Sequence, residues 1–96
     1  MGEDPVRIPI TGELDLHTFR PSEVEPLLED YFEACLEKGI YTVRIIHGKG
    51  TGKLKKKVQA VLSRHRLVES FSQAAENAGG WGATQARLKS PRQSGS

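Results

Sequence analysis

An amphipathic segment over residues 22–39 constrains the fold of this 96-residue chain more than any other feature. Its apolar residues recur at spacings of three and four, which is the period of a helix with one buried face. Ser22 and Glu25 have the spacing of a capping box, and Pro26 falls within the expected first turn, where a missing N–H costs little. Gly39 is typical of the position just after a helix end. We therefore predict a helix whose buried face carries Val24, Leu27, Leu28, Tyr31, Phe32, Cys35 and Leu36.

Apolar stretches with strand character lie on both sides of this helix. Leu14 and Leu16 alternate with polar residues over 13–17, and residues 41–47 (YTVRIIH) are rich in β-branched side chains. A strand–helix–strand unit of this length predicts two parallel strands joined by a right-handed crossover.

The second half of the chain adds one helix and two strands. Residues 53–66 (KLKKKVQAVLSRHR) combine an apolar stripe with basic side chains on the remaining faces. Residues 67–74 and 82–88 read as short strands joined by a glycine-containing hairpin loop, so they pair antiparallel. The predicted order is βαβαββ, an α/β chain with a mixed four-stranded sheet.

The ends of the chain differ from its centre. Pro9 and Gly12 argue against a continuous strand near the start, so residues 1–12 are predicted to be an extended arm. The stretch after Leu88 is polar and rich in breakers, and we expect 90–96 to be a flexible tail. The folded domain is placed at 13–89.

The cysteine content and the length of the apolar runs indicate in which cellular compartment we expect the protein. The single cysteine, Cys35, cannot form an internal disulfide, and a zinc knuckle is excluded. No apolar run approaches the roughly 20 residues that span a bilayer, and the acidic start does not resemble a signal peptide. We expect a cytoplasmic protein with no membrane partner.

Charge is divided unevenly along the chain. Residues 1–40 contain 3 Lys/Arg and 10 Asp/Glu, a net charge of −7, whereas residues 41–96 contain 11 Lys/Arg and 2 Asp/Glu, a net charge of +9. Such asymmetry favours a polyanion as partner. The alternative is that the two halves fold together and neutralise each other.

A glycine-rich segment, HGKGTG at 47–52, lies between the second predicted strand and the basic helix. Alternate glycines allow sharp turns and close approach of a ligand, and a helix N-terminus favours phosphate. The segment is not a Walker loop, because His47 replaces its first glycine, and Leu54 stands where Ser or Thr would hold magnesium. Lys53 likewise breaks the dinucleotide fingerprint. The predicted phosphate-binding residues are Gly48, Lys49, Gly50, Thr51, Gly52, Lys53, Lys56 and Lys57; a flexible connector is the alternative.

The first strand carries a second candidate, Asp15 and His17. Alternation places both side chains on one face, about 6.5 Å apart along the strand. A carboxylate and an imidazole at that spacing could share one phosphodiester or one metal ion, and histidine serves as general acid or base near neutral pH. An inert surface pair is the alternative.

The LDLH segment at 14–17, the intervening helix and HGKGTG at 47–52 together resemble the small MutS-related (Smr) domain. The resemblance extends from about Leu14 to Leu88, with Thr18 where many members have glycine. It implies a two-layer α/β sandwich similar to the C-terminal domain of translation initiation factor three. It also implies nucleic-acid binding and, in many members, endonuclease activity. Members include DNA-nicking domains fused to mismatch-repair homologues and RNA-cleaving proteins that act on stalled ribosomes.

From this resemblance we predict a monomeric endonuclease acting on RNA or DNA, with Asp15, His17 and His47 as catalytic residues. On RNA a histidine could activate the 2′-OH without a metal, whereas DNA would call for an activated water and a divalent cation such as Mg²⁺. The main alternative is a non-catalytic module that binds nucleic acid or the ribosome. A small-nucleotide binder is a weaker third reading, given the broken nucleotide motifs.

Overall fold

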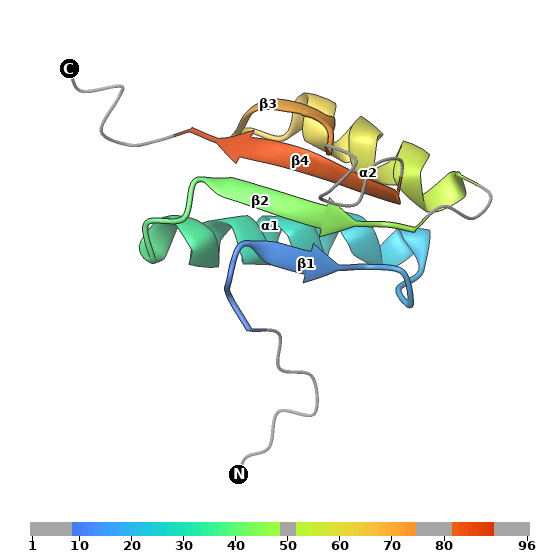
Figure 1. Ribbon diagram of the computed structural model, residues 1–96, viewed down its shortest axis with the longest axis horizontal. Helices are drawn as coiled ribbons and strands as arrows, with labels where there is room; N and C mark the ends of the chain where they lie inside the picture. The colour runs from blue at the N-terminus through green and yellow to red at the C-terminus, as the bar shows by residue number, and fades with distance from the viewer. Residues whose placement is uncertain (1–8, 49–51, 75–81, 90–96) are drawn as a thin grey trace, which may run out of the picture.

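The computed structural model describes residues 9–48, 52–74 and 82–89, which form six elements in the predicted βαβαββ order (Figure 1). The elements are β1 (Glu13–Asp15), α1 (Pro21–Glu37), β2 (Thr42–Ile46), α2 (Lys53–Arg64), β3 (Val68–Gln73) and β4 (Ala83–Leu88). Most of the predicted arm and tail lies outside these ranges. Neither α1 nor α2 is long and apolar enough to cross a membrane.

The four strands form one mixed sheet in the order β1-β2-β4-β3. β1 pairs parallel to β2, with Asp15 opposite Ile46. β4 pairs antiparallel with both β2 and β3, so that the last strand along the chain lies inside the sheet. The parallel first pair and the antiparallel final hairpin are both as predicted.

Both helices pack on one face of the sheet, which gives the two-layer sandwich that the resemblance implied (Figure 1). Leu14, Val43 and Ile45 turn inward from the strands to meet the helices. Five of the seven predicted apolar positions of α1 are fully buried, while Leu27 and Leu36 pack at the edge of the core. Burial raises the pKa of the Cys35 thiol to about 11, so the thiol stays protonated within this core.

The element ends differ from the prediction at three places. α1 begins at Pro21 and the Glu23 carboxylate accepts the Arg20 N–H at 2.9 Å, so the expected Ser22–Glu25 capping box is wrong. Proline is favoured at a first helical position because its φ is already helical, and the N-cap accordingly lies at Arg20, two residues before the predicted Ser22. Pro26 consequently lies inside the helix, beyond the first turn.

The first strand and the second helix are shorter than predicted. β1 ends at Asp15, because the chain turns where the Phe19 N–H donates to the Leu16 carbonyl at 2.9 Å. α2 ends at Arg64 instead of residue 66, and the following Leu67 N–H donates to the ring of His65.

The hydroxyl of Tyr31 attaches α1 to the start of β1. It accepts the Gly12 N–H at 3.1 Å and donates to the Glu13 carbonyl at 3.2 Å. Tyr31→Phe removes both bonds, and we expect the free energy of unfolding in urea to fall by about 1–2 kcal/mol. Tyr41→Phe is the matched control, because the Tyr41 hydroxyl has no hydrogen bond to any residue in the described ranges. Equal losses in the two variants would contradict this role.

Candidate functional site

Asp15 and His17 form a hydrogen-bonded pair at the end of β1. The Asp15 Oδ1 atom lies 2.6 Å from the imidazole Nδ1 and accepts the His17 backbone N–H at 3.0 Å. Their side chains are 52% and 60% exposed, so a large ligand can reach both. The predicted pairing is therefore present, although it arises from the turn after β1 and not from strand alternation.

The hydrogen bonds define the protonation of this pair. The side-chain and backbone hydrogen bonds from His17 hold the pKa of the Asp15 carboxyl below its usual range, so it is ionised at neutral pH. An ionised carboxylate can only accept, so the His17 Nδ1 atom carries the hydrogen. In the neutral ring the Nε2 atom then has a free lone pair, and no side chain in the described ranges is bonded to it. This nitrogen is available to take a proton from a substrate.

The turn that carries His17 does not depend on glycine. Within the described ranges, every residue with a positive φ is a glycine, so Thr18 adopts ordinary backbone geometry. The threonine found where many Smr domains have glycine is therefore compatible with this turn, and it is exposed.

The glycine-rich segment begins directly beside His17. A Cβ atom added to Gly48, whose φ is +85°, would lie 3.7 Å from the His17 Cβ. The Gly48 N–H is held by the Gly82 carbonyl at 2.9 Å. Gly52, with φ of +89°, precedes the first turn of α2. The structure thus brings both sequence motifs together, although the predicted ligands Lys49, Gly50 and Thr51 lie outside the described residues.

His47 occupies a different environment from His17. It follows Val43 and Ile45 in strand alternation, so its ring turns toward the helix layer and is only 4% exposed. The Nε2 atom lies 2.8 Å from the Thr84 hydroxyl and the Nδ1 atom 3.1 Å from the Gly48 carbonyl. Because a carbonyl only accepts, Nδ1 carries the hydrogen and Thr84 donates to Nε2. Burial chiefly, with a smaller contribution from nearby Lys55, lowers the pKa of His47 against an opposing hydrogen bond to Gly48.

These contacts give His47 the geometry of a residue that holds the loop in place. No described hydrogen bond joins it to Asp15 or His17. Its predicted contact with a scissile bond stays a prediction that this arrangement does not favour. Thr84, its buried partner, was not predicted, because a threonine in a short strand has no distinguishing sequence signal.

The cations on and just after α2 fall into two groups. At the end of α2, Arg64 and Arg66 pair with Glu25, Glu29 and Glu33 of α1, so part of the charge asymmetry is neutralised within the fold. Near the loop, Lys53 and Lys56 of α2 are exposed and Lys57 is half-buried. The exposed lysines at the start of α2 therefore add positive charge beside the loop that begins at Gly48.

Residues 14–89 match the Smr domain family. The chain belongs to this family. It is 44% identical over 77 residues to the endonuclease MutS2 of Carboxydothermus hydrogenoformans and 46% identical over 80 residues to that of Geobacillus thermodenitrificans. These alignments cover 80% and 83% of this chain, but 10% of each relative, so the chain spans about a tenth of the length of these relatives.

Two solved structures share the fold. The Smr domain of Thermus thermophilus MutS2 superposes with a TM-score of 0.77 at 34% identity, covering 82% of this chain and 99% of that domain. YdaL, a stand-alone small MutS-related protein from Escherichia coli, superposes with a TM-score of 0.74 at 26% identity, covering 84% of this chain and 66% of YdaL. The fold of this Smr domain is therefore established along with its family.

Proposed function

We propose that this Smr domain is an endonuclease in which Asp15 and His17 act on the scissile phosphodiester. The observation that carries the proposal is the exposed His17 ring, whose Nδ1 atom is held by an ionised Asp15 and whose Nε2 atom is bonded to no side chain of the described residues. A carboxylate that fixes the tautomer of a histidine and stabilises its protonated form is a recurring arrangement for proton transfer. The relatives named as endonucleases support the reaction class.

On RNA, the pair needs only a second proton donor, such as water, beside the substrate itself. Neutral His17 takes the proton of the 2′-OH, and the 2′ oxygen attacks the neighbouring phosphorus. The bond to the 5′ oxygen breaks, and that oxygen receives a proton from a second donor such as water. Asp15 stabilises the imidazolium that forms during the attack. The products are a 2′,3′-cyclic phosphate and a 5′-hydroxyl end.

The glycine-rich segment supplies the binding side of the proposal. Gly48 lies against His17, and α2 begins directly after Gly52, so the positive end of its helix dipole is at this loop. A phosphate held between them would sit next to the imidazole, with Lys53 and Lys56 adding charge. His47 and Thr84 hold the start of this segment in place.

DNA lacks the internal nucleophile, so its cleavage would use water. No three His, Cys, Asp or Glu side chains of the described residues are grouped to hold a metal ion. Removal of divalent cations with a chelator tests the Mg²⁺ dependence of cleavage directly.

The test is to incubate end-labelled RNA and DNA with the protein, in magnesium and in chelator, and to identify the ends. We expect RNA to be cut in both conditions and to carry cyclic phosphate and 5′-hydroxyl ends. Cleavage that is lost in chelator would reassign Asp15 and His17 as metal ligands. A protein that binds both nucleic acids and cuts neither would be a binding module.

A further inference from the structure

The sheet face opposite the helices carries a polar surface that the proposed function does not use. Strand pairing aligns its side chains in rows, because directly paired residues point to the same face. One row runs from Ser70 through Arg87 to Thr42. The next runs through Ser72, Gln85, Arg44 and Glu13. Asp15, paired with Ile46, belongs to the row after that. The proposed catalytic pair, Asp15 and His17, therefore begins at the edge of the same face.

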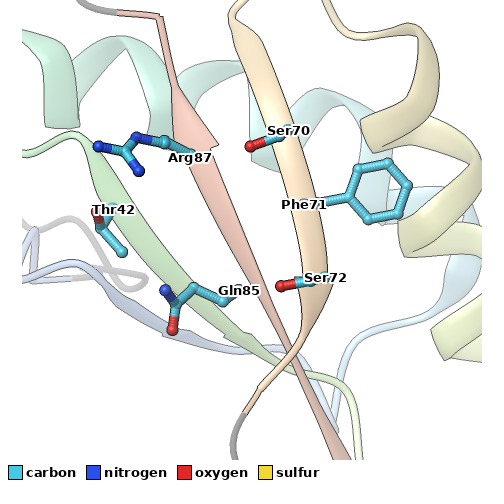
Figure 2. Close-up of a pocket in the computed structure, with 6 residues that line it drawn as sticks. All are labelled: Thr42, Ser70, Phe71, Ser72, Gln85 and Arg87. Carbon is cyan, nitrogen blue, oxygen red and sulfur yellow. The ribbon is translucent and has the colours of Figure 1, made fainter.

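A hollow of about 340 Å³ lies over the first two rows. Figure 2 shows Ser70 and Ser72 of β3 pointing toward Arg87 and Gln85 of β4, with Thr42 of β2 on the far side. Phe71 also lines the hollow but its ring points the other way, toward the helices. Among the described residues, the side chains that face the hollow are thus a guanidinium, an amide and three hydroxyls, with no carboxylate among them.

Arg87 is the charged group of this hollow. It is exposed, and none of the described residues pairs with it. By contrast, the neighbouring Arg44 is bonded to Glu13, and Arg64 and Arg66 are bonded to α1. A guanidinium without a carboxylate, surrounded by hydroxyl and amide donors, is complementary to a phosphate and its sugar.

The hollow lies within reach of the catalytic pair along one strand of nucleic acid. Arg87 is opposite Thr42, whereas Asp15 is opposite Ile46, four residues further along β2. The offset is about 13 Å along the strands and about 10 Å across two of them. A few nucleotides of extended chain would cover that diagonal without leaving the face.

We propose that this open sheet face binds the sugar–phosphate backbone of the strand to be cut, a few nucleotides to one side of the scissile bond. The proposal rests on the proposed function for the position of the cut. Arg87 holds a phosphate, and Ser70, Ser72 and Gln85 bond to the adjoining phosphate oxygens and sugar. Among the six described lining residues the one aromatic ring, that of Phe71, points away from the hollow, so we expect this face to hold the backbone and to tolerate different base sequences.

The test compares Arg87→Gln with Arg64→Gln, which makes the same charge change in the helix layer. Affinity is measured for a short RNA centred on the cut and for RNAs extended on the 5′ or the 3′ side. We expect wild-type protein to bind one extended RNA more tightly than the short one. Arg87→Gln should lose about tenfold in affinity for that RNA, lower the salt slope by about 1, and bind the short RNA as wild type does. Arg64→Gln should match the wild type throughout.

Ser72→Asp is the second variant, because it places a negative charge in the hollow without removing Arg87. It should reproduce the loss for the extended RNA, and a circular dichroism spectrum confirms folding in each variant. Arg87→Gln with full affinity for every RNA would overturn the proposal. So would an effect on self-association alone, measured by light scattering, since the face would then bind a second copy.

The outcomes separate the two proposals. If extended RNA binds through Arg87 but no RNA is cut, the backbone site stands and the endonuclease assignment fails. If RNA is cut and Arg87→Gln binds every RNA with wild-type affinity, the endonuclease assignment stands and the backbone site fails. A wild-type protein that binds no nucleic acid would overturn both.

Discussion

His17→Ala is expected to cut RNA about 100- to 10,000-fold more slowly than the wild type, which is the usual contribution of one general acid or base. Affinity for the same RNA should stay within a few-fold, because the glycine-rich segment and the lysines of α2 are unchanged. Cleavage is measured in single-turnover experiments with saturating protein, so that binding and chemistry are separated. His17→Gln keeps a donor toward Asp15 but has no basic nitrogen, and it should be as slow as His17→Ala. Cutting at the wild-type rate by either variant would refute the assignment.

The pH profile gives an independent measure of the same step. A histidine acts as a general base only in its neutral form, so the cleavage rate should rise with increasing pH and then level off. The hydrogen bonds from His17 lower the pKa of Asp15, so Asp15 is already ionised at neutral pH and adds no second limb there. The limb should disappear in His17→Ala. Adding Asp15→Asn to His17→Ala should cost little more, because the two residues act as one unit.

The hydrophobic period of the chain was sufficient to predict its elements and their order. Alternation also contained the signal for the burial of His47, since this residue continues the inward series of Val43 and Ile45. The catalytic role predicted for His47 came from the family resemblance and stays a prediction. A strand residue in phase with two core residues is therefore better assigned to the covered face, whatever motif it begins.

Contacts that depend on packing between segments far apart in the chain could not be predicted from the sequence. The bonds from Arg66 to Glu33 and Glu29 exist because α1 and α2 lie side by side, and neither helix indicates this on its own. Likewise, Arg87 and Thr42 become neighbours only because β4 inserts beside β2. The proximity of Asp15 and His17 could be predicted from the sequence, because the two residues are two positions apart and their hydrogen bond forms in a local turn.

The distribution of these ion pairs sets the salt dependence of nucleic-acid binding. Arg64 and Arg66 are already neutralised by α1, so they have few counterions to release. Lys56, Lys57 and Arg87 have no acidic partner among the described residues. With Lys53 beside the loop, about four phosphates would be contacted, far fewer than the net charge of the second half suggests.

Four contacts predict that affinity falls on the order of a hundredfold when the salt concentration is raised fourfold. The measurement is a titration of a fixed RNA by fluorescence anisotropy at several salt concentrations. Lys56→Gln should lower the slope by about 1, because it removes one contact, whereas Arg66→Gln should leave the slope unchanged while weakening the fold slightly. A slope that responds equally to both changes would mean that the ion pairs with α1 open on binding, and that the whole basic surface contacts the strand. An affinity indifferent to salt would remove phosphate contacts from the binding mode altogether.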